Sequence, residues 1–195
     1  MHVRFGLIAA ALALGAVASA QDAAPRDTAT ASVSGKKVAI EYGRPSLKGR
    51  SLDELTKQLP ADRIWRAGSE QVTTLTTETP LMVGGKKLAP GKYSVYIYAP
   101  EQGDWSLVLN SDQGIALIKL WDKAPANLAN APWPHLEGYS NILAKEVARA
   151  PMKAGTTAPP AEMFTVGLTP NKAGGATLLL SWSDKSWSLD LQPAK

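Results

Sequence analysis

The sequence has no cysteine in its 195 residues. Its stability must therefore come from packing rather than from disulfides, even in an oxidising compartment. The absence also excludes catalysis by a thiolate and every metal site that needs a sulfur ligand. A strong excess of one charge is lacking too, because the formal net charge is only +4. That value is too small to indicate a nucleic-acid partner.

Histidine is nearly absent as well. The chain contains two, His2 and His135, so a His-rich metal site is excluded and a metal would need carboxylate ligands. His135 could serve a Ser-His-Asp triad, but it lies in a proline-rich loop, where a solvated side chain is the simpler interpretation. The motifs of serine hydrolases, zinc proteases, P-loop NTPases and dinucleotide-binding domains are missing. The sequence therefore predicts no catalytic residue, no metal and no cofactor.

One long apolar run, from Phe5 to Val17, stands at the N-terminus. A positively charged start precedes it and small residues follow it, which predicts a signal peptide over residues 1–20. The run is shorter than the roughly 20 residues of a membrane-spanning helix, which disfavours the alternative of a membrane anchor. A lipoprotein anchor is excluded because no cysteine follows. We expect an exported, soluble mature chain, periplasmic or extracellular, with no integral membrane segment after cleavage.

Downstream of this segment, the sequence predicts a single all-β domain. Residues 21–28 are small and polar and indicate a flexible lead-in. From 29 to 195, short β-branched or aromatic segments recur about every 8–12 residues between turn-forming residues. This pattern favours an antiparallel β-sandwich of about 8–10 strands, with a jelly-roll-like connection as an open alternative. Hairpin turns are expected in "SGKK" (34–37) and "GGKK" (84–87).

Three segments have sequence patterns that predict a helix, a long loop and an edge strand. Ser51 and Glu54 have the spacing of a capping box, which predicts one short N-terminal helix closed by Pro60. Residues 122–142 contain repeated Pro and Gly breaks and predict a long loop. Pro151 restricts its strand to the edge of a sheet, because proline cannot donate to a central ladder.

The C-terminal part gives four local predictions. We expect a strand over 114–121 and a second loop over 154–160. The four residues "SDKS" (183–186) predict a turn between two strands. This turn would place Trp182 and Trp187 on one face of a hairpin.

Three sequence blocks occur in a fixed order and carry a family resemblance. They are YGRPSLKGRSL (42–52), IWRAGSEQVTTL (64–75) and VGGKKLAPGKYSVYIYAPEQGDWSLVLN (83–110). In these blocks the chain resembles domain of unknown function 2911, a family of exported bacterial proteins. Two departures are Glu70 and Gln71, where the family usually has Asn and Glu. The resemblance implies a β-rich extracytoplasmic domain and implies no known reaction.

Basic residues cluster between positions 44 and 66, next to aromatic residues. Guanidinium groups bind carboxylates and phosphates in a two-pronged geometry and stack on aromatic rings. The cluster therefore predicts a ligand site made of Arg44, Arg50, Trp65 and Arg66, with Glu70 orienting one guanidinium. The alternative is a structural network in which the arginines pair with nearby carboxylates and need no ligand.

Trp133 and Tyr139 are weaker candidates, because they lie in the predicted long loop. Exposed loop aromatics often bind ligands, although they could also pin the loop to the domain. The other large aromatic residues are expected to lie mainly in the core.

The predicted function is that of a non-enzymatic binding or accessory module. Its partner would be a polar or anionic small molecule, a glycan or an envelope protein. One alternative is a carboxylate-based hydrolase acting on glycans, with Glu70 as acid or base. Another is a structural protein of envelope assembly that uses an exposed sheet edge.

Overall fold

The computed structural model describes residues 24–135 and 138–194, and these form the predicted β-rich domain. The predicted signal peptide lies outside the described residues. The described part has thirteen strands, more than the expected 8–10, because three of the pairing segments contain only two residues. Within it, no helix has the length and the apolar character needed to cross a membrane.

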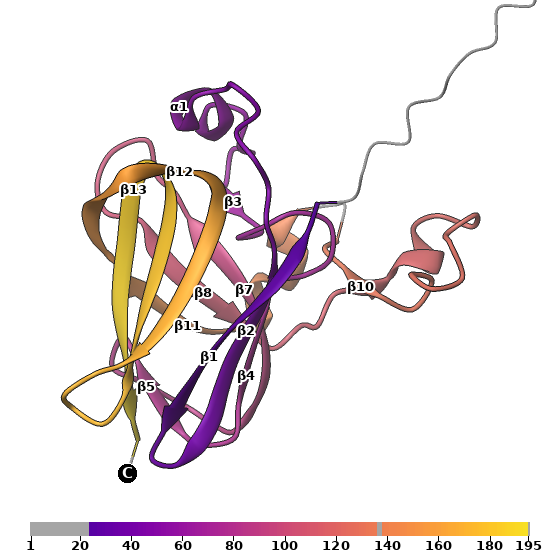
Figure 1. Cartoon of the computed structure of the whole chain (residues 1–195). Helices are drawn as coiled ribbons and strands as arrows, with labels where there is room; N and C mark the ends of the chain where they lie inside the picture. Colours follow the sequence, from indigo (N-terminus) through magenta and orange to yellow (C-terminus); the bar gives the residue numbers. More distant parts are fainter. Residues whose placement is uncertain (1–23, 136–137, 195) are drawn as a thin grey trace, which may run out of the picture.

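The strands form a large sheet, a small sheet and a separate two-stranded ribbon (Figure 1). The large sheet has the order β1 (Arg26–Val33), β2 (Lys36–Gly43), β4 (Thr74–Thr77), β7 (Gly91–Tyr98), β8 (Ser106–Asn110) and β11 (Glu146–Pro151). A short strand, β3 (Ile64–Trp65), also pairs with β7. The small sheet has the order β12 (Lys153–Pro170), β13 (Ala176–Pro193), β5 (Leu81–Val83) and β6 (Lys86–Leu88). The ribbon pairs β9 (Ile115–Ala116) with β10 (Pro132–Trp133).

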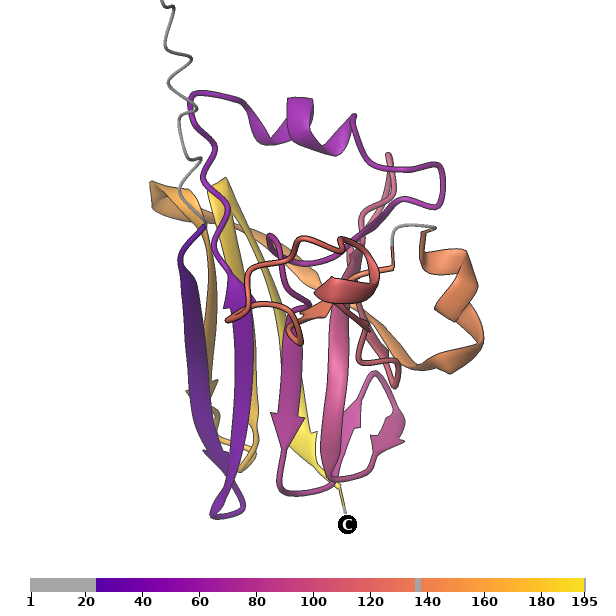
Figure 2. The ribbon, with the colours of Figure 1, turned by 90° about the vertical axis from the view of Figure 1, so that its right-hand side faces the viewer.

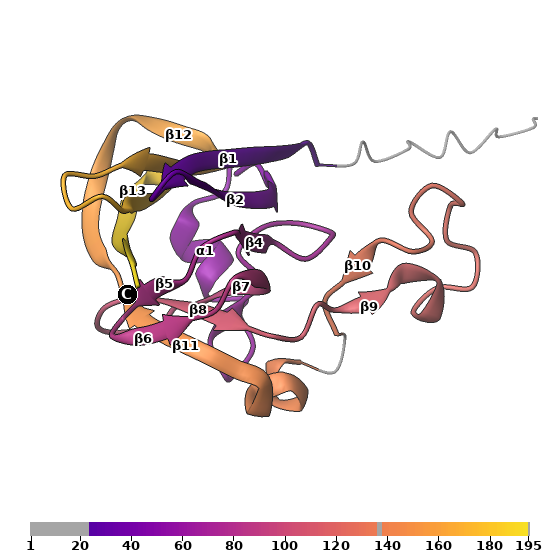
Figure 3. The same cartoon turned by 90° about the horizontal axis from the view of Figure 1, so that it is seen from below.

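The two sheets enclose one core, and the ribbon projects away from it (Figure 3). Strand β1 contacts β12 on one side, and β11 contacts β5 and β6 on the other, so the sheets meet along both sides. The strands of the large sheet keep their chain order, but the chain crosses to the small sheet for β5 and β6 between β4 and β7.

Strand β2 shows how the sequence builds the core. Val38, Ile40 and Tyr42 are buried, whereas Glu41 between them is exposed. Successive side chains of a strand point to opposite faces, so apolar residues at every second position create one buried face. Other large, fully buried core side chains are Leu75, Leu81, Ile97, Leu107, Leu109, Met152, Phe164, Leu178 and Leu191.

Part of the outer face of the large sheet is also covered. Tyr96 and Val108 are buried there in a cluster with Tyr139 and Ile142 of the 3₁₀ helix η2 (Tyr139–Lys145). The rings of Tyr96 and Tyr139 meet edge to face, with centroids 4.9 Å apart. The C-terminal end of the predicted long loop is therefore packed against the sheet.

The predicted helix is α1 (Leu52–Thr56), which lies across one end of the sandwich (Figure 2). The hydroxyl of Ser51 accepts a hydrogen bond from the N–H of Glu54, and the Glu54 carboxylate accepts one from the N–H of Ser51. The capping box is thus confirmed. Leu52 is the buried residue of this helix.

Both predicted hairpin turns are confirmed. Ser34 and Gly35 have φ values of 52° and 76°, and Gly84 and Gly85 have values of 55° and 78°. Positive φ at both central positions is the feature of type I′ turns, whose twist matches that of the flanking strands. The edge prediction also holds, because Pro151 ends β11, the last strand of the large sheet.

Two predictions for the C-terminal part are wrong. Residues 154–160 belong to β12 rather than to a loop, and residues 183–186 belong to β13 rather than to a turn. The β12–β13 pairing shifts register at two points, and Ser183 has a φ of 57°. Such bulges absorb extra residues, so that proline-rich and polar segments continue a strand instead of ending it. Trp182 and Trp187 consequently lie on one strand, not on the two arms of a hairpin.

Two further boundaries differ from the predictions. Strand β1 begins at Arg26 and pairs with β2 from there, so the flexible lead-in over 21–28 is wrong for its last three residues. Of the strand expected over 114–121, only Ile115–Ala116 is extended, and Leu117–Lys119 forms the 3₁₀ helix η1. The periodicity of a short apolar run does not distinguish a strand from a helical turn.

Candidate functional site

The predicted site residues line two pockets rather than one. The first, which we call the basic pocket, has a volume of about 620 Å³, and its lining includes Arg44, Ser46, Lys48, Arg50, Ser69 and Glu70. The second, the Arg66 pocket, has a volume of about 310 Å³, and its lining includes Asp62, Trp65, Arg66, Tyr96, His135 and Tyr139. Residues 66–73, between β3 and β4, contribute to both pockets. Residues that are close in sequence are thus divided between two cavities.

Arg44 follows β2 and ties this strand to its neighbours. Its Nε donates to the carbonyl oxygen of Phe164 at 3.3 Å, and its Nη2 donates to Oγ1 of Thr165 at 3.2 Å. Its Nη1 lies 3.5 Å from a carboxylate oxygen of Asp27. These contacts fit the structural interpretation of Arg44, although the residue also forms part of the pocket wall.

Arg50 has no carboxylate partner among the described residues. Its Nε donates to the carbonyl oxygen of Leu47 at 2.9 Å, and its Nη2 donates to that of Ser46 at 3.3 Å. Both acceptors are neutral, so these bonds fix the guanidinium without an ion pair. Glu54 lies near enough for the charge of Arg50 to help lower the pKa of this carboxyl group. Lys48 and Gly49 have φ values of 50° and 77°, which turn the chain sharply and leave the Lys48 side chain exposed.

The acids next to the basic pocket already accept hydrogen bonds. Oε1 of Glu162 accepts from the hydroxyl of Ser46 at 2.6 Å and from the N–H of Lys48 at 2.9 Å. These two hydrogen bonds lower the pKa of Glu162. Oδ1 of Asp27 accepts from the N–H of Thr28 at 2.7 Å.

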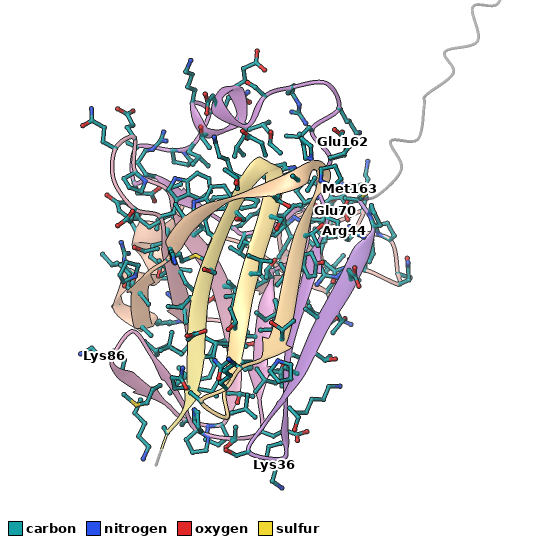
Figure 4. All side chains as sticks on the ribbon, turned by 60° about the vertical axis from the view of Figure 1, so that its left-hand side comes forward. Lys36, Arg44, Glu70, Lys86, Glu162 and Met163 are labelled. Atoms are coloured by element: carbon teal, nitrogen blue, oxygen red, sulfur yellow. The ribbon has the colours of Figure 1, made fainter. Side chains whose placement is uncertain are left out.

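Glu70 makes no hydrogen bond or ion pair with an arginine among the described residues, and its orienting role stays a prediction. Its Oε1 accepts a hydrogen bond from the N–H of Ala24 at 2.9 Å. Its charge acts on Arg66 and counters the lowering of the pKa of that guanidinium by burial. Beside it, the hydroxyl of Ser69 is buried without a hydrogen-bond partner among the described residues. Gly43 lies so close to the Ser69 carbonyl that a side chain there would collide with it. Figure 4 shows the end of the sandwich at which these residues gather, with labels on Arg44, Glu70, Glu162 and Met163.

Trp65 belongs to an aromatic cluster beneath α1. Its ring stacks on Trp182 with centroids 5.2 Å apart and meets Phe164 edge to face at 4.8 Å. A second stack joins Trp105 to Trp187 at 4.1 Å. Part of the Trp65 ring is therefore used for packing, and its role in stacking on a ligand stays a prediction.

The Arg66 pocket combines a guanidinium without an ion pair and a buried hydroxyl. The Arg66 residue is exposed overall and has no hydrogen-bond or ion-pair partner in the described part of the chain. Burial of its guanidinium lowers the pKa of Arg66, and the charge of Glu70 partly opposes this effect. Tyr96 is only 5% exposed, and its hydroxyl is buried without a hydrogen-bond partner there. Burial raises the pKa of Tyr96 to about 12, so this hydroxyl keeps its proton at neutral pH.

Next to this pocket lies a polar network that the sequence does not reveal. Oδ1 of the buried Asp112 lies 3.0 Å from Nε2 of His135 and accepts from the N–H of Gly114 at 2.8 Å. Oδ2 of Asp112 accepts from Nζ of Lys145 at 2.7 Å. Burial acts to raise the pKa of Asp112, but the hydrogen bonds from Lys145, Gly114 and His135 outweigh it and lower the pKa. His135 is thus held by a carboxylate and is not simply a solvated loop residue.

The two loop aromatics differ from each other. Tyr139 is buried, accepts a hydrogen bond from the amide of Asn110 at 3.3 Å and donates one to Glu146 at 2.9 Å. It fixes the loop to the sheet, as the alternative interpretation expected. Trp133 is half-buried in β10 and pairs with Ile115. Its role in binding stays a prediction.

A family model described as "Protein of unknown function (DUF2911)" matches residues 24–191, which is most of the chain. The chain belongs to the DUF2911 family. The match extends beyond the three sequence blocks and includes the residues that line both pockets. Comparisons with curated proteins and with solved structures found no match.

Membership in DUF2911 gives one local departure a physical reason. Glu70 has a φ of 60°, a left-handed conformation that asparagine tolerates better than glutamate. The asparagine that the family resemblance leads us to expect would suit this backbone, whereas the longer side chain of Glu70 holds Ala24.

Among the described residues of this DUF2911 protein, no group of three or more His, Asp or Glu side chains could hold a metal ion.

Proposed function

We propose that this DUF2911 protein is an exported, non-enzymatic binding module that holds a small anionic molecule in the basic pocket. Sugar acids and phosphate monoesters are the classes of ligand that fit this chemistry. The observation that carries the proposal is the geometry of Arg50, whose guanidinium is fixed by two neutral carbonyl groups and has no carboxylate within ion-pair distance among the described residues. A guanidinium that is held in place without a direct carboxylate partner is suited to a carboxylate or a phosphate.

The charge balance of the pocket lining supports an anion. The lining contains three cations, Arg44, Lys48 and Arg50, and one carboxylate, Glu70. The neighbouring Asp27 lies near Arg44, and the neighbouring Glu162 accepts hydrogen bonds from Ser46 and Lys48, so these two acids offset part of the positive charge.

The size of the pocket is also suitable. Its volume of about 620 Å³ lies within the range of roughly 300–1,000 Å³ that is usual for small-molecule sites. Hydrolysis of a glycoside commonly needs two carboxyl groups that face the sugar. Because Glu70 is the one acid in the described part of the lining, the pocket favours binding over the hydrolase alternative.

Thermal-shift measurements on the mature protein, residues 21–195, test the proposal. The panel contains galacturonate, glucose 6-phosphate and inorganic phosphate, with galactose as a neutral comparison. We expect the anions, and not galactose, to raise the melting temperature. Loss of one charge-assisted contact of about 1.4 kcal/mol weakens binding roughly tenfold. Lys48→Gln and Arg50→Gln should therefore weaken the shift.

Lys36→Gln is the matched control, because Lys36 is an exposed turn lysine at the opposite end of the sandwich (Figure 4). This variant should respond like the wild type. The proposal fails if no anion in the panel stabilises the wild type, or if Lys36→Gln and Lys48→Gln lose the response equally.

A further inference from the structure

A cavity beneath helix α1 shares no lining residue with the basic pocket in the described part of the chain. It consists of an inner chamber of about 130 Å³ and an outer chamber of about 570 Å³. Leu52, Thr56 and Trp105 line both chambers, so the two adjoin. Helix α1 forms the roof at the end of the sandwich (Figure 2), and the stacked tryptophans form the floor.

The inner chamber is apolar. Apart from Thr56, its described lining consists of leucine, tryptophan and alanine side chains. Four of the large ones pack against the core but stay only half-buried, namely Leu55, Leu59, Trp65 and Trp105. Apolar surface that folding leaves uncovered can still be buried by an apolar ligand group, and this burial favours binding.

Arg63 holds the roof at a fixed distance from the large sheet. Its Nη1 donates to the carbonyl oxygen of Thr56, at the end of α1, at 2.9 Å, and its Nε donates to that of Ala99, directly after β7, at 3.0 Å. The N–H of Ala99 donates in turn to the carbonyl oxygen of Arg63 at 2.9 Å. The cavity is therefore part of the folded structure and does not need a ligand to open it.

The inner chamber has room for one ring. An apolar cavity of about 150 Å³ in a protein core binds benzene, which sets the scale for the 130 Å³ of this chamber. A phenyl group or a short alkyl chain fits this space. A sugar ring does not suit it, because its hydroxyls would lack hydrogen-bond partners among these apolar side chains.

The outer chamber combines aromatic and charged side chains. Trp105 and Trp187 are stacked there, with ring centroids 4.1 Å apart. Three cations and two acids also line it, namely Lys57, Arg63, Lys185, Asp53 and Glu101. Both acids are exposed, and their carboxylates have no hydrogen-bond or ion-pair partner in the part of the chain that the structure describes. Hydroxyl groups both donate and accept, so a hydroxylated group can use the cations and the carboxylates alike.

We propose that the cavity beneath α1 binds a small amphiphile that has one ring-sized apolar group and a neutral, hydroxylated head. The apolar group lies in the inner chamber against Trp65 and Trp105. The head lies in the outer chamber, where its hydroxyls donate to the carboxylates and accept from the cations of the lining. This site is independent of the one proposed for the basic pocket, which selects ligands by negative charge.

Calorimetric titration of the protein spanning residues 21–195 with phenyl β-glucoside tests the inference. Glucose provides the head without the ring, and benzyl alcohol provides the ring with a single hydroxyl. We expect phenyl β-glucoside to bind at least about tenfold more tightly than glucose and about threefold more tightly than benzyl alcohol. Because all three probes are neutral, Lys48→Gln in the basic pocket should leave these affinities unchanged.

Variants at Thr56 locate the binding, because this residue lines both chambers. Thr56→Phe places a ring in the space that the ligand would occupy and should weaken phenyl β-glucoside at least about tenfold. Thr56→Val is the matched control, because it keeps the size of the side chain and the backbone carbonyl that Arg63 binds. This control should bind phenyl β-glucoside as tightly as the wild type.

Glu101→Gln tests the head without changing the inner chamber. Glu101 is exposed and does not line that chamber, so the variant should keep the melting temperature of the wild type. Loss of the charged acceptor should weaken phenyl β-glucoside about threefold and leave benzyl alcohol unchanged.

Three results would overturn the inference. One is that phenyl β-glucoside binds the wild type no more tightly than glucose or benzyl alcohol. Another is that Thr56→Phe folds and binds it as tightly as Thr56→Val. The third, which also decides the matter if Thr56→Phe does not fold, is that Glu101→Gln binds phenyl β-glucoside as tightly as the wild type.

Discussion

Replacing Asp112 by alanine should destabilise the protein by about 2–4 kcal/mol at pH 7. Asp112 is only 9% exposed, and its carboxylate binds His135, Lys145 and the N–H of Gly114. Losing the bonds to His135 and Gly114 costs about 1–1.5 kcal/mol each, at or below the low end for a charged acceptor, because both donors are partly exposed and can turn to water. The side chain of Lys145 is 58% exposed, so its ion pair adds less than about 1 kcal/mol.

The pH dependence of this effect has a definite sign. The pKa of Asp112 in the folded protein lies below its ordinary value of 3.8. A carboxylate with a lowered pKa stabilises the fold above the pKa of the unfolded state, and this stabilisation is lost as the pH falls through the folded pKa. The difference between the wild type and Asp112→Ala should therefore be complete at pH 7 and shrink as the pH falls below about 4.

Urea denaturation of both proteins at pH 7 and at pH 3 measures this difference. Asp184→Ala is the control, because Asp184 is 56% exposed and pairs only with the adjacent Lys185 in the described structure. It should change the free energy of unfolding by less than about 0.5 kcal/mol. An Asp112→Ala variant as stable as this control at pH 7, or a difference that grows at pH 3, would refute the reasoning.

Two further predictions concern packing. Gly84→Ala should lower the free energy of unfolding by about 2–3 kcal/mol in urea denaturation, because its Cβ would lie 2.5 Å from that of Ala150. The Cβ of Gly85→Ala would meet no atom within 4 Å, so this variant should lose only about 1 kcal/mol, for its positive φ. Equal losses of stability in Gly84→Ala and Gly85→Ala would contradict the predicted clash with Ala150. Trp182→Ala should cost about 3–5 kcal/mol because it empties a buried, stacked position. Trp121→Ala, at a side chain 49% exposed, should stay within about 0.5 kcal/mol of the wild type, and a similar loss in both variants would contradict this account.

Local backbone chemistry explains which parts of the fold the sequence predicts well. Both type I′ turns and the capping box depend on residues two or three positions apart, so a short stretch contains the whole signal. The edge position of Pro151 likewise follows from the single hydrogen bond that proline cannot donate.

The secondary-structure predictions that are wrong concern segments whose conformation depends on pairing with a distant strand. Residues 154–160 have the composition of a loop, and they are extended only because β13 accommodates them with bulges. The same holds for 183–186, whose polar residues lie in a strand rather than in a turn. Composition describes the residues of a segment but not the partner that fixes their conformation.

In the candidate site, too, local sequence signals are predicted well and contacts between distant segments are not. The cluster of arginines was visible in the sequence, and Arg44 and Arg50 do line one pocket. The sequence could not show that Arg66 lines a second pocket, because the separation depends on how the chain between β3 and β4 folds. The contact of His135 with Asp112 joins residues from two different segments and has no local signal.

Chemical-shift mapping of ¹⁵N-labelled protein spanning residues 21–195, titrated with inorganic phosphate, tests the central claim most directly. We expect shifts of backbone amides at residues 44–50 and 68–71, which include lining residues of the basic pocket. These shifts should weaken in Lys48→Gln and persist in Lys36→Gln. A titration that moves no amide in these two segments, or that moves those around Lys36 equally, would contradict the proposal that the basic pocket binds anions.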